Sequence, residues 1–392
     1  MYYHRPAFIS AHLSLVALVF LLLPIARGKH WELIFAASYE RILKFHRWLG
    51  RLCFLTGAVH LVIVLVNNTD ATSTVPYGPQ QAVVPLFGLL AFIAFGTMAL
   101  VSIDPIRRMF YSYFFIHHRV AAIVGIVCVL LHSHTACYAM VLSLTVYGLT
   151  LIARLYAALA NTTTTAKSTK WAQVANPCSF FWVNIPSVSL IEWHPFSAVV
   201  APDGNSIAFC VKAMGANRFT DKAVCVVADA TSSGDESRLT LRLDGPHGKP
   251  ALDVDNYDVL VFVAGGIGIT PLLSLINRHH AKISRDVEIH LHWVVQSPQD
   301  LLVVDSLMFP LPATFKATFY ASQAKEAGFV LCQTGDGVAY VGGRPILDEI
   351  VNVERHSKRV GVLACGPPAL VHDAEWHSHA CGFDFHKEVF AF

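Results

Sequence analysis

Charged residues are scarce in this 392-residue sequence, at 14% of the chain against about 25% in an average soluble protein. The scarcity lies in the first part: residues 1–160 contain 11 Lys/Arg and 4 Asp/Glu, whereas 161–392 contain 18 and 23. The formal charge is therefore +7 in the first part and −5 in the second. This division excludes one uniform soluble domain, a disordered chain and a nucleic-acid binder. It predicts a membrane half followed by an ordinary globular half.

The sequence also lacks any Cys-x-x-Cys pair, although it contains nine cysteines. A zinc ribbon needs such pairs, and a disulfide framework needs several cysteines on the oxidising side of a membrane. Only Cys137 is expected near the outer surface. Neither a zinc ribbon nor a disulfide framework is therefore predicted.

Five apolar stretches are long enough to cross a bilayer, which takes about 20 residues. Their bounds are 7–26, 46–66, 82–103, 118–138 and 140–159. The first could instead be a secretory signal peptide, but residues 24–27 make a poor cleavage site. We therefore expect five transmembrane helices.

Basic residues are unevenly distributed among the loops, and they mark the cytosolic side of a membrane. Loops 67–81 and 137–140 contain none, whereas 27–51, 104–117 and the segment after the last stretch contain several. The N-terminus is therefore expected outside and the second half in the cytosol. Asn67-Asn68-Thr69 is then a candidate glycosylation acceptor outside. The protein is predicted to cross the plasma membrane or an endomembrane several times, and which of the two stays open.

Four histidines in the apolar stretches form two matched pairs. His46 and His60 are 14 residues apart on one predicted helix, and His118 and His132 are 14 apart on another. At about 100° per residue this spacing leaves a rotation of about 40°, so each pair lies on one face, about 21 Å apart along the axis. One helix separates the two, so both run in the same direction. His46 can face His118 near the cytosolic side and His60 can face His132 near the outer side, which predicts two haem irons with two imidazole ligands each.

His117 and His134 are rival ligands, but neither gives the 14-residue spacing to a histidine on its own helix. A single membrane histidine more often packs against a neighbouring helix, and His12 is interpreted in that way. Two pairs at identical spacing favour haem ligation, because ionisable residues inside a membrane are functional candidates by default.

A polar linker is expected at 161–170, and short alternating runs separated by turn signals follow it. The runs are 171–185, 196–200, 206–213, 223–229 and 238–243. They predict a small β barrel that ends near residue 250. Strands are then expected at 258–264, 287–295, 338–341 and 360–364, with a helix at 271–281. This alternation is typical of a parallel α/β domain. The predicted domains are 1–160, 161–250 and 251–392.

A glycine-rich turn at 265–271 joins the expected strand at 258–264 to the expected helix. Glycines let a phosphate approach the backbone, and a helix N-terminus favours its negative charge. The turn is not a GxGxxG fingerprint. Gly245-Pro246-His247-Gly248 is either a plain tight turn or a second backbone cradle for a pyrophosphate.

Taken in order, the motifs resemble those of the ferric reductase and NADPH oxidase superfamily of transmembrane flavocytochromes over nearly the whole chain. In the membrane half, residues 23–27 and 45–60 resemble the haem-helix region of that superfamily. The flavin and nucleotide motifs of the superfamily, HPF[ST], GPxG, the nicotinamide-nucleotide turn, CGP and the aromatic C-terminus, are matched by residues 192–197, 245–248, 265–271, 365–368 and 388–392.

The resemblance implies a role for each matching residue. The flavin ring would be held by His194, Pro195, Phe196 and Ser197, and its pyrophosphate by Gly245, Pro246 and Gly248. The nicotinamide nucleotide would contact Gly265, Gly266, Gly268, Thr270, Pro271, Cys365, Gly366 and Pro367. Cys365 would shape the pocket without acting as a nucleophile. Lys212 is either a flavin-phosphate contact or a solvated lysine, and Phe390 and Phe392 compete to stack on the flavin.

Three departures from the family pattern bear on function. Residues 293–296 resemble a WxxR motif but end in Gln296, where an Arg would grip a 2′-phosphate, so NADPH or NADH stays open and Arg344 could supply the charge. NADPH oxidases carry another histidine one turn after the position of His60, where this chain has Val64; this favours a metal acceptor over dioxygen. Five helices are fewer than many members have, and the missing one would be the first, outside the haem-binding core.

The resemblance implies a membrane α-helical bundle followed by a ferredoxin-reductase-like module, made of an FAD-binding β barrel and an NAD(P)-binding α/β domain. The predicted function is transfer of electrons from cytosolic NAD(P)H through FAD and two b-type haems to ferric or cupric chelates across the lipid bilayer, with no catalytic acid–base residue. The alternatives are a superoxide-producing NADPH oxidase, a non-catalytic scaffold, and a transporter or proton channel. The acceptor and the oligomeric state stay open.

Overall fold

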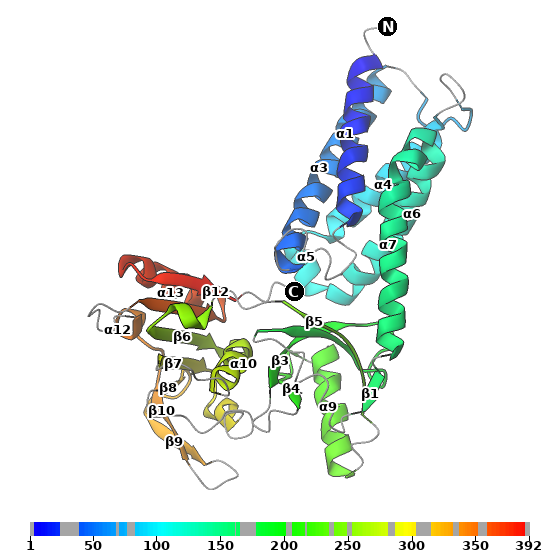
Figure 1. The fold of residues 1–392 in the computed structure, drawn as a ribbon. Coiled ribbons are helices and arrows are strands. Elements are labelled where there is room, and N and C mark those ends of the chain that lie inside the picture. Colours follow the sequence, from blue (N-terminus) through cyan, green and yellow to red (C-terminus); the bar gives the residue numbers. More distant parts are fainter. Residues whose placement is uncertain are drawn as a thin grey trace. The chain divides into compact units, whose positions relative to one another are not determined.

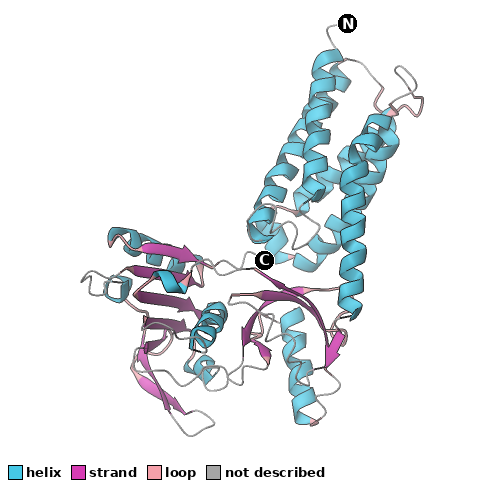
Figure 2. Cartoon of the chain, viewed as in Figure 1, coloured by secondary structure: helices cyan, strands magenta, loops and turns pink. Residues whose placement is uncertain are grey.

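The computed structural model describes most of the chain (Figures 1 and 2). The described residues are 4–23, 39–67, 70–76, 83–160, 162–164, 178–200, 206–215, 218–234, 239–248, 253–280, 287–302, 315–331, 337–351 and 359–388. The candidate glycosylation motif reaches beyond them at 68–69, and Phe390 and Phe392 also lie outside. The chain divides into two compact units, Met1–Leu155 and Tyr156–Phe392.

The first unit is a helical bundle, which confirms the predicted fold class for this half. Its helices are α1 (His4–Leu22), α3 (Tyr39–Val66), α4 (Pro85–Val101), α5 (Asp104–Met109), α6 (Tyr111–His132) and α7 (His134–Ala160). Within the described residues, Ile42–Val66, Tyr113–His132 and His134–Tyr156 are long and apolar enough to cross a membrane, and α1 and α4 contain shorter apolar helices. Four of the five predicted stretches overlap one helix each, the stretch 118–138 covers α6 and also the start of α7, and the short α5 is an addition.

Large apolar side chains are exposed on the outer surface of every long helix of this unit. Examples are Phe20, Leu55, Ile93, Ile123 and Leu142, one on each of the five helices. Leaving such surface in water costs about 25 cal/mol per Å², whereas lipid tails are as apolar as the side chains themselves. The surface of the bundle therefore suits a bilayer.

The turn between α6 and α7 comes earlier than the sequence predicts. The hydropathy pattern places it at 137–140, whereas Ser133 is the one residue between the two helices, with an extended backbone (φ −148°, ψ 131°). Ser133 forms a β-bridge with Val83, and the Val84 N–H donates to the His132 carbonyl at 2.9 Å. The polar segment His132–His134 is only three residues long and is flanked by long apolar runs, so the hydropathy pattern does not separate the two helices there.

Glycines allow α4 to pack closely against its neighbours. A Cβ atom added at Gly125 of α6 would lie 2.3 Å from the ring of Phe95 on α4. A Cβ added at Gly88 of α4 would lie 2.7 Å from the ring of His132 on α6. Small residues at helix contacts are how membrane helices approach without a hydrophobic driving force.

The second unit begins with an antiparallel sheet of five strands in the order β1-β5-β2-β3-β4. The strands are β1 (Thr162–Thr164), β2 (Phe180–Asn184), β3 (His194–Val200), β4 (Ile207–Phe209) and β5 (Thr240–His247). Strand β1 lies inside the stretch predicted as a linker, because its three residues pair with β5. Phe181, Val183 and Leu243 form part of the buried core of this sheet.

One predicted strand is wrong: residues 223–229 belong to helix α9 (Phe219–Ser232). The valines of this stretch favour a strand locally. Phe219, Ala223 and Val226, however, recur at helical spacing and pack into the core of the five-stranded sheet. Burial of that stripe outweighs the local preference.

The rest of the second unit is a sheet of seven strands in the order β12-β11-β6-β7-β8-β10-β9. The strands are β6 (Val259–Gly265), β7 (Glu288–Val295), β8 (Phe315–Ala321), β9 (Gly328–Leu331), β10 (Gly337–Gly342), β11 (Val360–Cys365) and β12 (Asp384–Lys387). All neighbours are parallel except the edge pair β9 and β10. This confirms the predicted parallel α/β fold.

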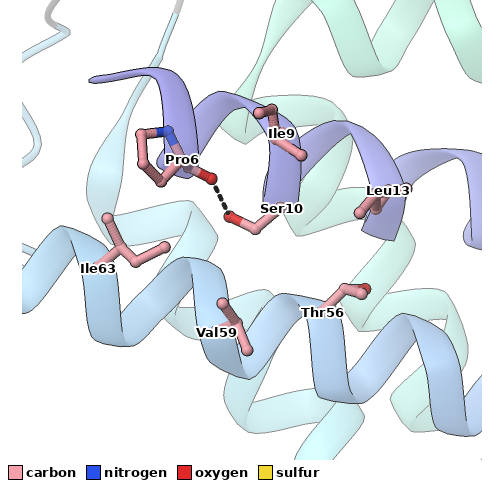
Figure 3. Close-up of a pocket in the computed structure, with 7 residues that line it drawn as sticks. All are labelled: Pro6, Ile9, Ser10, Leu13, Thr56, Val59 and Ile63. Atoms are coloured by element: carbon pink, nitrogen blue, oxygen red, sulfur yellow. Dashed lines mark hydrogen bonds between the residues drawn. The ribbon is translucent and has the colours of Figure 1, made fainter. Parts of the chain in front are cut away.

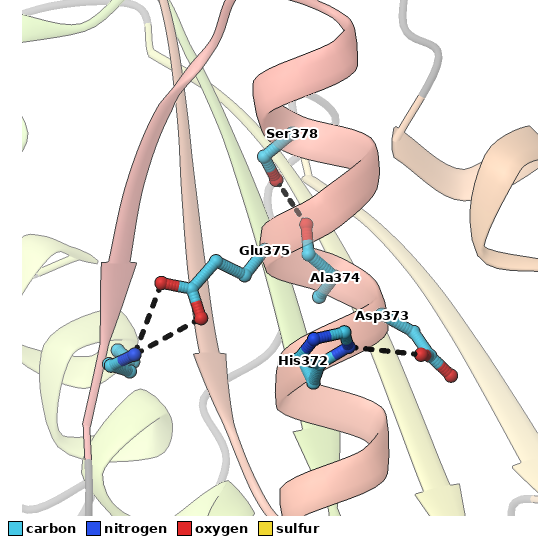
Figure 4. Close-up of polar contacts among 6 residues, drawn as sticks. His372, Asp373, Ala374, Glu375 and Ser378 are labelled. Carbon is cyan, nitrogen blue, oxygen red and sulfur yellow. Dashed lines mark hydrogen bonds and ion pairs between the residues drawn. The ribbon is translucent and has the colours of Figure 1, made fainter.

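Helices cover both faces of this sheet. Helix α10 (Ile269–His280) packs on one face, and α12 (Leu347–Val351) and α13 (Pro368–Ala380) pack on the other. On the buried side of α13, the Ser378 hydroxyl donates to the Ala374 carbonyl (Figure 4). His372 and Asp373 pair with each other, and Glu375 pairs with Lys387 of β12 at 3.1 Å.

Replacing Gly125 with Val should separate α6 from α4, because the new side chain would overlap the Phe95 ring. Overpacking of this kind costs about 1–3 kcal/mol of unfolding free energy. The measurement is the midpoint of thermal unfolding in detergent, which should fall. Gly148→Val on α7 is the matched control, since a Cβ there meets no atom within 4 Å. An equal fall in both variants would contradict the packing argument.

Candidate functional site

Two histidines of α3 face two histidines of α6. The rings of His46 and His118 have centroids 6.2 Å apart and are tilted by 62°. Fourteen residues further along the same two helices are His60 and His132. The structure therefore brings His46 and His118 together and places the second predicted pair on the same two helices.

Each of these four rings is held through its Nδ1 atom. His46 donates to the Leu21 carbonyl at 3.3 Å, His60 to the Ala7 carbonyl at 3.0 Å and His132 to the Val84 carbonyl at 2.8 Å. His118 lies 3.3 Å from the Ser102 hydroxyl, whose own proton goes to the Met98 carbonyl. Carbonyl oxygens only accept, so the proton of these imidazoles sits on Nδ1 and the Nε2 lone pair is free for a metal.

The geometry of the His46–His118 pair fits one metal ion between two imidazoles. Metal–imidazole bonds are about 2 Å long, so two rings on opposite sides of one ion have centroids about 6 Å apart. The measured 6.2 Å agrees with that value. Within the described part of the chain, no cluster of three or more His, Cys, Asp or Glu side chains could hold a metal ion.

The rival histidines have other surroundings. The His117 ring stacks on Tyr113 with centroids 5.6 Å apart. His134 is exposed in the first turn of α7. His12 bonds to the Phe8 carbonyl of its own helix at 2.8 Å.

In the second unit, the residues predicted to hold a flavin lie on β3. His194, Pro195, Phe196 and Ser197 are its first four residues and pair with β2. The His194 ring stacks on Phe219 at 4.0 Å, so it also fixes the start of α9. Ser197 is buried.

The turn at the end of β5 contains the predicted pyrophosphate contacts Gly245, Pro246 and Gly248. Gly248 has a positive φ of +83°, and a Cβ at Gly245 would lie 2.6 Å from the Phe181 ring. Between them, buried His247 pairs with buried Asp244 at 3.2 Å. The backbone of this turn is therefore fixed by glycine conformations and by one buried polar pair.

Lys212 does not stand free as a flavin-phosphate contact in this structure. Its Nζ lies 2.8 Å from the Asp300 carboxylate in the short 3-10 helix η6 (Pro298–Leu302). The pair joins the part of the chain with the five-stranded sheet to the part with the seven-stranded sheet, across 88 residues of sequence. Sequence reasoning has no signal for this partner.

The predicted nucleotide residues meet between β6 and β11. A Cβ at Gly268 would lie 2.4 Å from the Cys365 carbonyl oxygen, and one at Gly265 would lie 2.4 Å from Pro367. Gly266 has φ +53°, and a Cβ there would meet nothing within 4 Å, so its backbone is open to a ligand. Gly366 lies in the same contact, against Gly265.

The sheet topology makes this place a ligand crevice. From β6 the sheet continues through β7 and β8 on one side and through β11 and β12 on the other, so the direction of winding reverses between β6 and β11. Open α/β sheets bind ligands outside the carboxyl ends of their strands at such a switch point. The N-terminus of α10, which follows the glycine turn, adds backbone N–H groups that favour phosphate.

Further residues fix the glycine turn. Thr270 donates to the Ile267 carbonyl at 3.0 Å. The Trp293 indole donates to the Gly266 carbonyl at 2.8 Å, and Cys178 donates to the Pro271 carbonyl at 3.6 Å. Burial, with a smaller effect of the Glu388 charge, raises the pKa of Cys178 well above its usual value, so it stays a thiol. Neither Trp293 nor Cys178 has a sequence pattern that reveals this role.

Gln296 and Arg344 lie at one edge of the seven-stranded sheet. Gln296 is the first residue after β7, and Arg344 is the second residue after β10. The strands β7, β8 and β10 are parallel neighbours, so these two residues lie two strands apart, about 10 Å. Arg344 is exposed there. At the other end of the crevice, the Glu388 N–H donates to the Ala364 carbonyl at 3.0 Å, immediately before the tail that contains Phe390 and Phe392.

Comparison with known proteins places three families along the chain. The family described as "Ferric reductase like transmembrane component" matches residues 10–129. An "FAD-binding domain" matches 157–251, and a "Ferric reductase NAD binding domain" matches 257–378.

Curated relatives match the same regions. Ferric reduction oxidase 8, mitochondrial, of Arabidopsis thaliana is 26% identical over 354 residues, which covers 84% of this chain and 47% of that protein. Ferric reduction oxidase 2 of the same plant is 28% identical over 67% of this chain and 38% of its own length. A superoxide-generating NADPH oxidase heavy chain of Dictyostelium discoideum is 24% identical over 55% of this chain and 49% of its own length. The chain spans less than half the length of these relatives.

The three matches follow one another as a ferric-reductase-like transmembrane component, an FAD-binding domain and an NAD-binding domain. The chain belongs to the ferric reductase and NADPH oxidase superfamily.

Replacing Gly268 with Ala should widen the contact between the two loops, because the Cβ would overlap a main-chain oxygen of Cys365. NAD(P)H affinity should fall at least tenfold, which corresponds to about 1.4 kcal/mol. The measurement is nucleotide titration of the purified protein, with FAD content recorded in parallel. Gly337→Ala in β10 is the control, since a Cβ there is 3.7 Å from Phe329, an ordinary contact. Unchanged affinity in Gly268→Ala would remove the glycine turn from the nucleotide site.

Proposed function

We propose that the chain carries electrons across a membrane, from NAD(P)H through FAD and two b-type haems to a ferric chelate. The observation that carries the proposal is the His46–His118 pair, whose ring centroids lie 6.2 Å apart, a separation at which both imidazoles could hold one haem iron. When bound, the flavin would convert a two-electron donor into single electrons and the haems would pass them on.

The proposed role of the helical unit is to hold iron ligands at two depths. His46 and His118 would ligate one haem, and His60 and His132 the other. The Nδ1 bonds to Leu21, Ala7, Val84 and Ser102 support these roles, because they fix each ring and leave Nε2 for iron. About 21 Å of helix separates the two depths.

The proposed role of the second unit is to bring a nicotinamide against a flavin. His194, Pro195, Phe196 and Ser197 would contact the flavin ring, with the Ser197 hydroxyl as donor. The residues that would contact the pyrophosphate or the nicotinamide nucleotide are Gly245, Pro246, Gly248, Gly265, Gly266, Gly268, Thr270, Pro271, Cys365, Gly366 and Pro367. Their close backbone packing supports a site that excludes water.

The sequence supports the proposed orientation and acceptor. The basic loops favour a cytosolic position for both soluble domains, so electrons would leave on the opposite side. Val64 stands where NADPH oxidases carry a further histidine, which favours a metal chelate over dioxygen. The names of the Arabidopsis relatives agree with a ferric acceptor, and the name of the Dictyostelium relative keeps superoxide formation as the second candidate.

Vesicles that contain the purified protein test this proposal, with NADPH or NADH outside and ferric chelate sealed inside. The wild type should show about two haems per FAD and reduce the enclosed iron. His132→Ala should abolish that reduction, because one ligand pair is broken, and should leave nucleotide-dependent flavin reduction intact.

His134→Ala is the matched control, since His134 lies two residues away in α7 and has no facing histidine in the assignment. Loss of iron reduction in His134→Ala but not in His132→Ala would reverse the ligand assignment. Vesicles that reduce oxygen and leave the chelate untouched would favour the oxidase.

Gln296→Arg should raise the preference for NADPH over NADH, because an arginine pairs with a 2′-phosphate through charge-assisted bonds. We expect a gain of about tenfold or more in the ratio of kcat/KM values, about 1.4 kcal/mol. Arg344→Gln should act in the opposite direction if Arg344 supplies the charge in the wild type. Steady-state flavin reduction with both nucleotides is the measurement. Identical ratios in all three proteins would place the 2′-phosphate elsewhere.

A further inference from the structure

Helices α1 and α3 meet along a seam of polar contacts that repeats every seven residues. Ala7, Ser14 and Leu21 of α1 contact His60, Cys53 and His46 of α3, in that order. The middle contact is a bond from the Ser14 hydroxyl to the Cys53 carbonyl at 2.9 Å. A seven-residue repeat on both helices keeps one seam facing the partner along its whole length.

The contacts at the two ends of this seam are the hydrogen bonds that orient His60 and His46 of α3. Both acceptors are main-chain carbonyls of α1, and they lie 14 residues apart, the same spacing as His46 and His60. Nothing in the side chains of Ala7 and Leu21 reveals this function, because only their backbone oxygens take part. Hydrogen bonds to the second nitrogen of a ligating imidazole raise its basicity and set the potential of the metal.

Ser10 bonds to the Ala7 carbonyl, the same oxygen that accepts from His60. Its hydroxyl is buried and lies 3.0 Å from the Ala7 carbonyl and 3.0 Å from the Pro6 carbonyl. Figure 3 shows Ser10 and its bond to Pro6 on α1, facing a shallow apolar groove lined from α3 by Thr56, Val59 and Ile63. The carbonyl that accepts from His60 therefore also lies within reach of a serine hydroxyl.

We propose that α1 is part of the redox centre, with the Ala7 and Leu21 carbonyls orienting His60 and His46 and with Ser10 tuning the outer ligand as a positioning residue. This rests on the proposed haem ligation by the two pairs. While the Ser10 hydroxyl occupies the Ala7 oxygen, the oxygen accepts less strongly from His60. Removing the hydroxyl makes His60 a more basic ligand, which stabilises ferric over ferrous iron.

Ser10→Ala in the full-length protein tests the proposal through the midpoint potentials of the two haems, measured by optical and EPR redox titration. The potential that disappears in His132→Ala identifies the outer haem. Ser10→Ala should shift that potential to more negative values, by up to about tenfold in the reduction equilibrium or about 59 mV for one electron. The inner potential should stay unchanged.

Ser143→Ala is the matched control, because the Ser143 hydroxyl makes the same kind of bond, 3.1 Å to the Met140 carbonyl three residues earlier, with no histidine on that acceptor. It should move neither potential. An unchanged outer potential in Ser10→Ala, or equal shifts in both serine variants, overturns the role of Ser10.

Gly50→Val tests the other end of the seam, where a Cβ would lie 3.3 Å from the Leu21 side chain. It should move α1 away from His46. The EPR signal of the haem proposed at His46 and His118 should therefore change more than that of the haem proposed at His60 and His132. Gly148→Val is the control here as well. A wild-type protein without two bis-imidazole haems contradicts the proposed function itself. If two haems are present but their potentials and EPR signals are unchanged in both Ser10→Ala and Gly50→Val, only the role of α1 is contradicted.

Discussion

The bilayer interior offers no water, so every polar group of the helical unit needs a partner inside the protein. The constraint is strongest for the imidazoles, because each has two ring nitrogens that need a partner. His46, His60 and His132 each donate the Nδ1–H to a main-chain carbonyl, which leaves the Nε2 lone pair on each ring. The arrangement of the helices follows from this: α3 and α6 must run in the same direction, and α1 and the ends of α4 must supply acceptors at two depths.

The second unit solves a different problem with its backbone. A dinucleotide needs close approach to N–H groups at a helix N-terminus, and side chains stand in the way. Gly265 and Gly268 let one loop pack against Cys365 and Pro367 of the neighbouring loop, and Gly266 stays open. Parallel strands bring these loops together, since β6 and β11 are adjacent and end at the same edge. The Trp293 indole then fixes the turn from β7.

The sequence predicts those features that depend on a long repeat or an ordered set of motifs. The pairing of the α3 and α6 histidines follows from a spacing of 14 residues, and the parallel sheet follows from alternating strands and helices. Features decided by tertiary packing escape it. The valines at 223–229 predict a strand until the core contacts of Phe219 are known, and the Lys212–Asp300 pair joins residues that no pattern connects. The acceptors at Ala7 and Leu21 are backbone atoms, which carry no residue identity at all.

The length of α4 shows how tightly the parts depend on one another. At 17 residues it is shorter than an ordinary membrane span, and its two capping residues are Val84 and Ser102. These are the partners of His132 and His118. The histidines lie about 21 Å apart along α6, and a helix of 17 residues is about 25 Å long, so α4 has the length that places one cap beside each ring. A longer α4 would carry one acceptor past its histidine. The shortness of α4 is therefore the property that lets its two ends contact both histidines of α6.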